Sequence, residues 1–128
     1  MLWDTSVFID YLRNRTPSLA YMEQVRNGLV EGYCSVNTEA ELWAGHRTDE
    51  ERLRAAAVLF YFSIVPLDSA TARLAGSLLN RKSPGEKKAH FRDSLIAATA
   101  IQQGEAVLTA DAASQRVFGD AVDYLIYP

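Results

Sequence analysis

Acidic side chains recur where short apolar segments end and where helices are expected to begin. Asp4 follows Met-Leu-Trp, Glu41 lies near the start of an expected helix, Asp93 lies in the first turn of another, and Asp111 follows an apolar segment that ends at Thr109. Carboxylates brought together repel one another, and a divalent cation relieves that repulsion. Oxygen ligands without Cys or His favour Mg²⁺ or Mn²⁺, and such a site activates water for in-line displacement at phosphorus. These residues therefore predict a metal site for phosphodiester chemistry.

The elements that must position these acids alternate between strands and helices. We expect strands near residues 1–4, 33–36, 63–66, 106–109 and 122–126, and helices near 7–14, 17–28, 38–45, 49–62, 69–80, 91–103 and 112–117. Short apolar strands separated by helices predict an α/β fold, a three-layer α/β/α sandwich with a short, mostly parallel central sheet. Such sheets bind ligands beyond the carboxyl ends of their strands. The length of the chain predicts a single domain over residues 1–128.

Capping residues set the expected ends of these helices. Ser6 is expected to cap the first helix, Asn37 or Thr38 the third, and Asp68 the fifth. Gly104 is expected to stop the helix that begins near residue 91. The segment 81–88, which contains Pro-Gly, is expected to be a polar loop.

Several of the acids also have a purely structural interpretation. Glu41 fits a capping box with Thr38, Asp93 fits the first turn of its helix, and Asp111 fits an N-cap. Glu39 and Glu41 point about 200° apart on a helix, so only one of them is expected to reach the cleft. A carboxylate at Asp4, directly after an apolar strand, is costly if it is buried without partners, which favours a functional role there.

Composition excludes several other classes of protein. The chain has 128 residues, 48% of them apolar, and a net charge of −3, which is an ordinary globular mixture. A single cysteine, Cys34, leaves no disulfide framework and fits a reducing cytoplasm, and no secretory leader or membrane span is expected. The sequence has no P-loop, and Ser6 stands where an Asp-x-Asp phosphotransferase would need its second acid. A receiver-type signalling domain would need a lysine beyond Lys88, and none follows it.

Basic residues gather just before Asp93. Between positions 81 and 92 five basic side chains face a single acid, Glu86; they are Arg81, Lys82, Lys87, Lys88 and Arg92. We interpret them as a rim that guides a polyanion to the metal, with Arg13 and Arg15 as further members, although a solvated loop would have the same composition.

Aromatic and apolar residues on the helices have two interpretations as well. Base stacking is one role for Tyr11, Trp43, Tyr61 and Phe62, but their helical spacing favours core or dimer packing for most of them. The first two helices carry more apolar residues than a small sheet requires, which suggests a groove for a partner or a dimer face.

Taken in order, the acidic motifs resemble one protein family. Asp4-Thr5-Ser6, the Glu-Leu-x-x-Gly run 41–45, the run Asp-Ser-Leu-Ile-Ala-Ala-Thr from 93 to 99, and Thr-Ala-Asp at 109–111 resemble the four motifs of PIN-domain nucleases. The size of the chain is similar to that of VapC-type toxins of toxin–antitoxin pairs. Many relatives carry a further acid where this chain has Ser114.

This resemblance implies a function as well as a fold. It implies a Mg²⁺- or Mn²⁺-dependent endoribonuclease with Asp4, Glu41, Asp93 and Asp111 around the metal and with Ser6 and Thr109 assisting. It also implies an RNA substrate, a homodimer, and an antitoxin that blocks the cleft. The alternative is a catalytically silent PIN-like module that binds RNA or an antitoxin. For an active enzyme we predict that Asp4→Asn abolishes cleavage and leaves the melting curve near that of the wild type, or raises it.

Overall fold

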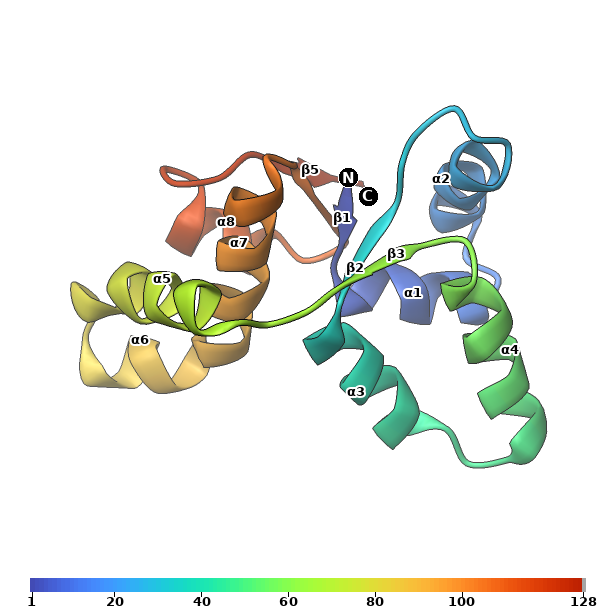
Figure 1. The fold of residues 1–128 in the computed structure, drawn as a ribbon, viewed down its shortest axis with the longest axis horizontal. Coiled ribbons are helices and arrows are strands. Elements are labelled where there is room, and N and C mark those ends of the chain that lie inside the picture. The colour runs from blue at the N-terminus through green and yellow to red at the C-terminus, as the bar shows by residue number, and fades with distance from the viewer. Residues whose placement is uncertain (128) are drawn as a thin grey trace.

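In the part of the chain that the structure describes, five short strands form one parallel sheet at the centre of the molecule (Figure 1). A computed structural model describes residues 1–127. The strands lie in the order β3-β2-β1-β4-β5, and every neighbouring pair is parallel. Their bounds are β1 Leu2–Trp3, β2 Tyr33–Ser35, β3 Ser63–Val65, β4 Val107–Thr109 and β5 Tyr124–Ile126. The expected α/β sandwich is confirmed, and its sheet is parallel throughout.

Within the described residues 1–127, eight helices cover the sheet. Their bounds are α1 Thr5–Leu12, α2 Thr16–Arg26, α3 Val36–Gly45, α4 Asp49–Leu59, α5 Ser69–Asn80, α6 Pro84–Ala89, α7 Phe91–Gln103 and α8 Ala112–Phe118. Helices α1 to α4 lie on one side of the sheet and α5 to α8 on the other (Figure 1). Within residues 1–127 no helix is both long and apolar enough to span a bilayer.

The two-residue strand β1 joins the two cores. Successive side chains of a strand point to opposite faces, and Leu2 and Trp3 are both fully buried. Leu2 packs in the cluster that includes residues of α7 and α8, whereas Trp3 packs in the cluster formed with α1 to α4. There its ring lies 5.1 Å from that of Phe8 and 4.8 Å from that of Phe62. β1 is therefore held between two apolar layers, and the residue that follows it has a fixed position.

Two predicted helix starts are wrong. Helix α1 begins one residue after Asp4, whose carboxylate accepts the Thr5 amide, so Ser6 is inside the helix and does not cap it. Helix α3 is capped by Ser35, whose hydroxyl accepts the Thr38 amide. Ser35 is the last residue of β2, and Asp4 directly follows β1, so at most one residue separates each strand from its helix.

The polar loop predicted for residues 81–88 is also wrong, because most of that segment belongs to helix α6. Ser83 caps this helix by accepting the Glu86 amide, and Pro84 occupies its first turn. Helix α4 ends at Leu59, short of the expected residue 62, and β5 begins at Tyr124 rather than at residue 122.

Other expected boundaries are confirmed. Asp68 and Asp111 cap α5 and α8, and Gly104 ends α7 in the left-handed conformation with φ of 66°.

The core packing predicted for the aromatic residues is confirmed for Phe62 and in part for Tyr11. Trp43 and Tyr61 are 42% and 45% exposed and lie outside the core.

Candidate active site

Asp4 stands at the carboxyl end of the central strand, where it is almost completely buried. Its Oδ1 accepts the Thr5 amide at 2.8 Å, and its Oδ2 accepts the hydroxyls of Ser6 at 3.1 Å and Thr109 at 2.9 Å. The same hydroxyls accept the amides of Ala110 and Asp111. Asp4, which follows β1, is thus held by hydrogen bonds from the start of α1 and from the end of β4.

Glu41 reaches the same region from helix α3. Its Oε1 accepts the hydroxyl of Thr5 at 3.0 Å, and the Thr5 oxygen lies 3.0 Å from the hydroxyl of Thr38. Thr38 in turn accepts the hydroxyl of Ser35. Since an ionised carboxylate only accepts hydrogen bonds, the donors must run in one direction along this chain and end on Glu41. Thr38 therefore orients Glu41 through Thr5, and the predicted capping box with Thr38 is not formed.

Arg92 links Glu41 to Asp93. Its guanidinium donates to Glu41 Oε2 at 2.9 Å and lies 3.7 Å from Asp93 Oδ1. Partial burial lowers the pKa of Arg92, but the charges of Glu41, Asp93 and Asp4 outweigh that effect and raise the pKa above its ordinary value. A positive charge therefore stands in the combined field of the three carboxylates.

Two further residues near Asp93 were not predicted from the sequence. His90 Nδ1 lies 3.0 Å from Asp93 Oδ2, and since the carboxylate only accepts, the ring proton is on that nitrogen. Tyr124 places a buried hydroxyl that has no hydrogen-bond partner within residues 1–127. Burial, then Asp93 and Asp4, raise the pKa of Tyr124. The three-residue spacing of His90 and Asp93 across a helix start was a usable signal, whereas nothing in the sequence marked Tyr124.

The remaining acids lie differently. Asp111 is exposed, and its Oδ1 accepts the Ala113 amide as the cap of α8. Its backbone amide joins it to Thr109, so Asp111 borders the Asp4 network without sharing a hydrogen bond with the other carboxylates. Glu39 lies near the buried Cys34, where burial and then the Glu39 charge raise the thiol pKa to about 12. Glu41, and not Glu39, is the residue that contacts Arg92.

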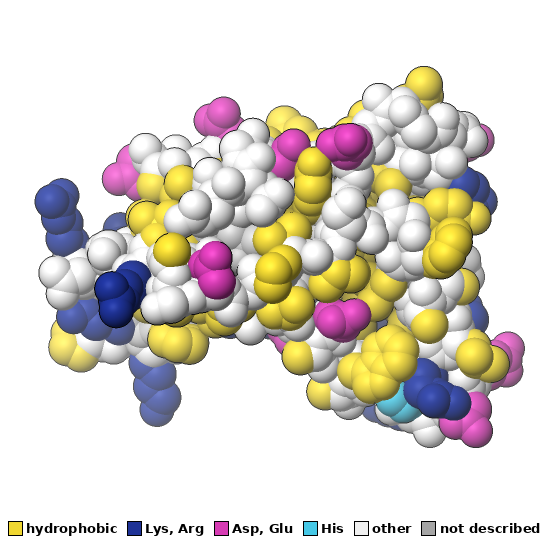
Figure 2. Space-filling model, viewed as in Figure 1, with side chains coloured by type: hydrophobic (Ala, Val, Ile, Leu, Met, Phe, Trp, Pro, Cys, Tyr) yellow, Lys and Arg dark blue, Asp and Glu magenta, His cyan; other side chains and the backbone are white. Residues whose placement is uncertain are grey.

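Of the five basic residues expected to form a rim, only Arg92 contacts the acids. Lys82 donates to the Val117 carbonyl at 3.1 Å, near the end of α8. Arg81 and Lys88 are exposed, and Lys87 is half-buried. Lys and Arg side chains gather at the end of the molecule formed by α5 and α6 (Figure 2). RNA binding by this group stays a prediction.

The donor set suits a hard divalent cation. Asp4, Glu41 and Asp93 offer only oxygen ligands, which Mg²⁺ and Mn²⁺ prefer. Within residues 1–127 no three acidic, His or Cys side chains converge closely enough to form a finished metal site. The Arg92 guanidinium supplies the positive charge between Glu41 and Asp93 in this arrangement. A cation would therefore bind where Arg92 now makes its ion pairs.

Comparison with known families decides the classification. The PIN domain family matches residues 1–119, which is most of the chain. The chain belongs to the PIN-domain family. No curated protein sequence matches this PIN domain at a significant level.

Solved structures share the fold of this PIN domain. A toxin–antitoxin complex from Klebsiella pneumoniae is 21% identical with a TM-score of 0.76, covering 97% of this chain and 94% of that one. VapBC2 from Rickettsia felis, bound to a DNA fragment from its promoter, is 14% identical with a TM-score of 0.76, covering 99% and 98%. VapBC-1 from nontypeable Haemophilus influenzae is 18% identical with a TM-score of 0.72, covering 98% and 96%.

Proposed function

We propose that this PIN domain is a Mg²⁺- or Mn²⁺-dependent endoribonuclease and the toxin of a toxin–antitoxin pair. The observation that carries the proposal is that Glu41 and Asp93 both contact Arg92 at the carboxyl end of the sheet, where the charge of the buried Asp4 also acts on this arginine. Hydrogen bonds from neighbouring hydroxyls hold Asp4 and Glu41 before any ligand arrives. A preorganised group of oxygen ligands is what hydrolysis of a phosphodiester requires.

Each residue has a defined part in this proposal. Asp4 and Asp93 would bind the cation, with Glu41 and Asp111 as the further oxygen ligands that would complete its shell. Bound there, the cation supplies water of lowered pKa and neutralises negative charge on the phosphate. Ser6 and Thr109 both donate hydrogen bonds to Asp4 Oδ2 and so fix the orientation of the Asp4 carboxylate. In-line attack of water on phosphorus leaves a 5′-phosphate on one product and a 3′-hydroxyl on the other.

Arg92 changes partners during binding in this proposal. Its guanidinium offsets the repulsion among the acids while no cation is present, because its own pKa is raised by the same acids. With a divalent cation bound, the Arg92 guanidinium would be free to pair with a phosphate oxygen of the RNA. Arg92 is the member of the predicted rim whose contacts support this part.

The solved neighbours support an antitoxin as a partner. The Klebsiella pneumoniae structure is a toxin–antitoxin complex, and the Rickettsia felis VapBC2 structure holds promoter DNA. We propose that this chain likewise pairs with an antitoxin that covers the cleft, and that it forms a homodimer. Sedimentation of the partner-free chain as a monomer at micromolar concentration would exclude the homodimer.

A silent binding module is the second candidate. The ion pairs of Arg92 with the acids, and the lack of three converged ligands within the described residues, favour a site that is closed to metal. Such a module would bind RNA or an antitoxin without cleaving either.

One experiment separates the two candidates. The purified, partner-free chain is incubated with total RNA and Mg²⁺ or Mn²⁺, with an EDTA control. Asp4→Asn serves as the inactive variant and Asp68→Asn as its match, since Asp68 caps α5 outside the site and Asn caps equally well. If the chain is the proposed nuclease, only the wild type and Asp68→Asn should cleave RNA at discrete positions, and only when metal is present. Absence of cleavage by folded wild type across several RNA pools would establish the binding module instead.

A further inference from the structure

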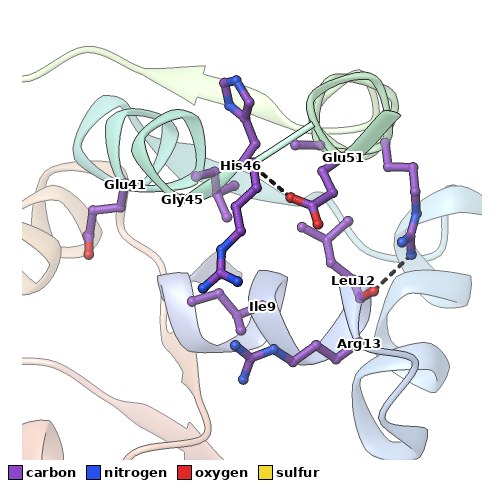
Figure 3. Close-up of a pocket in the computed structure, with 11 residues that line it drawn as sticks. Ile9, Leu12, Arg13, Glu41, Gly45, His46 and Glu51 are labelled. Carbon is purple, nitrogen blue, oxygen red and sulfur yellow. Dashed lines mark hydrogen bonds between the residues drawn. The ribbon is translucent and has the colours of Figure 1, made fainter. Parts of the chain in front are cut away.

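A hollow of about 410 Å³ lies between helices α1, α3 and α4 (Figure 3). Its volume falls within the range of roughly 300–1,000 Å³ that small-ligand sites occupy. Its apolar side chains are Ile9, Leu12 and Leu42, and its basic ones are Arg13, Arg47 and Arg54. Glu41, Leu42 and Gly45 of the Glu-Leu-x-x-Gly run line this hollow, but apart from Glu41 the proposed reaction gives its lining no part.

The hollow is continuous with the candidate active site through one residue. Glu41 lines the hollow, and its carboxylate also contacts Arg92 and Thr5 in the acidic cluster. In Figure 3 Glu41 lies at the α3 end of the hollow, while Arg13 extends along its α1 side. A strand whose phosphate lies at the carboxylates would therefore have its next nucleotide over this hollow.

The charges of the hollow suit a polyanion. The two acids that line it already have partners: Glu51 accepts the Arg47 amide at 2.7 Å, and Glu41 accepts Arg92. Arg54 donates to the Leu12 carbonyl at 2.8 Å and fixes α4 against the end of α1. Within residues 1–127 the guanidiniums of Arg13 and Arg47 form no ion pair, unlike those of Arg15, Arg52 and Arg92. Two unpaired cations thus border an apolar floor.

Gly45 keeps the hollow open. It ends α3 and lines the hollow, and a Cβ added there would meet no atom within 4 Å. Its φ is not positive, so the backbone does not require glycine at this position. A side chain at position 45 would therefore occupy free space in the hollow without straining the helix.

From these observations we propose that the hollow is an RNA subsite, which holds the nucleotide next to the scissile phosphate. Arg13 and Arg47 bind the phosphate of that nucleotide, and its base lies on the floor of Ile9, Leu12 and Leu42. The proposal rests on the proposed endoribonuclease function and adds the path of the substrate. The apolar floor gives the base a surface that accepts any sequence, because stacking and apolar contact need no hydrogen-bond code.

The test compares two double variants that remove the same charge. Arg13→Gln with Arg47→Gln alters the hollow, whereas Arg52→Gln with Arg116→Gln removes two arginines that do not line it. Binding of a fluorescein-labelled, mixed-sequence single-stranded RNA is measured by anisotropy in EDTA, where cleavage is absent. Losing both arginine contacts to this one phosphate should weaken binding about tenfold at physiological salt and lower the slope of log K against log salt by about 0.7. Gly45→Leu, which adds bulk and no charge, should weaken binding with the slope unchanged.

The outcomes distinguish this subsite from the proposed reaction. If the wild type binds RNA through the hollow but cleaves none with Mg²⁺ or Mn²⁺, the subsite stands and the nuclease fails. If the wild type cleaves and both double variants show equal RNA affinity and KM, the subsite is refuted. It is also refuted if the wild type binds no RNA in EDTA, or if the hollow variants keep RNA binding and lose only inhibition by a protein partner.

Discussion

Replacing Asp4 by Asn tests how the central carboxylate is held. The carboxylate accepts three hydrogen bonds, one at Oδ1 and two at Oδ2. An amide has one accepting oxygen and one donating nitrogen. In one orientation the amide oxygen faces Ser6 and Thr109, and the N–H₂ group then faces the Thr5 amide, which loses its acceptor. In the other orientation the oxygen faces the Thr5 amide, and both hydroxyls lose their acceptor. Every orientation therefore breaks at least one of the three bonds.

The magnitude follows from the strength of these bonds. A hydrogen bond to a buried charged group contributes about 1.5–3 kcal/mol, and the surviving bonds weaken when the charge is lost. Removing the Asp4 charge also relieves its repulsion with the other acids. This gain in stability is small, because the same charge attracts Arg92 and raises the pKa of that residue. We expect the free energy of unfolding to fall by about 2–4 kcal/mol, which lowers the melting temperature by roughly 8–16 °C in a domain of this size. The structure thus reverses the expectation from the sequence, which was an unchanged or higher melting temperature.

The assay is thermal unfolding followed by circular dichroism at neutral pH in EDTA, with cleavage measured separately on protein that is still folded. Asp111→Asn is the matched control, because Asp111 is exposed and Asn keeps the cap of α8. Its melting temperature should stay within about 2 °C of the wild type. An Asp4→Asn protein that melts at or above the wild-type temperature would show that repulsion among the acids outweighs the three hydrogen bonds, and would refute this reasoning.

Three further predictions concern a hydrogen bond, a buried thiol and a backbone conformation. Thr5→Val removes the hydroxyl donated to Glu41 and should cost about 1–3 kcal/mol in urea unfolding, with Thr5→Ser restoring most of it; equal stability of the two variants would contradict this role. Cys34, whose thiol pKa is raised to about 12 chiefly by burial, should resist thiol reagents at pH 8 until the chain unfolds. The thiol ionises at lower pH in the unfolded chain than in the folded one. The protonated, buried thiol therefore makes its full contribution to stability at neutral pH, and this contribution is lost as the pH rises from 9 toward 12, which alkaline unfolding curves would show. Gly104→Ala should lower stability by about 1 kcal/mol because φ is 66°, whereas Gly76→Ala inside α5 should raise it slightly, and the opposite order of melting temperatures would rule this out.

The local signals in the sequence predicted the parallel sheet and three of the helix ends, although the predicted caps of α1 and α3 were wrong. The strand ends at Asp4 and Thr109 were predicted to share one edge because parallel strands align their carboxyl ends, and the structure joins the two residues at 2.9 Å. Asp68, Asp111 and Gly104 were identified as helix ends because capping depends on neighbours within one turn.

What the sequence did not predict depends on contacts between distant segments. Arg92 was assigned to a flexible rim, but it pairs with Glu41, 51 residues away, because of how α3 and α7 are placed. The burial of the Tyr124 hydroxyl near Asp93 likewise depends on how β5 is placed against α7. Helix α6 was missed because Pro84-Gly85 is typical of turns, although Ser83 and Glu86 form a helix start.

The bond between Asp4 and Thr109 also has a consequence for how the protein is made. The two residues are 105 positions apart, so at ordinary rates of synthesis Thr109 is added roughly 5 to 20 seconds after Asp4. During that interval β1 lacks its neighbour β4, and Asp4 lacks one of the two hydroxyls that hold its Oδ2. A nascent chain on the ribosome therefore has Asp4 but not yet the Thr-Ala-Asp motif that completes its surroundings. The proposed nuclease activity would therefore arise only after most of the domain has been synthesised.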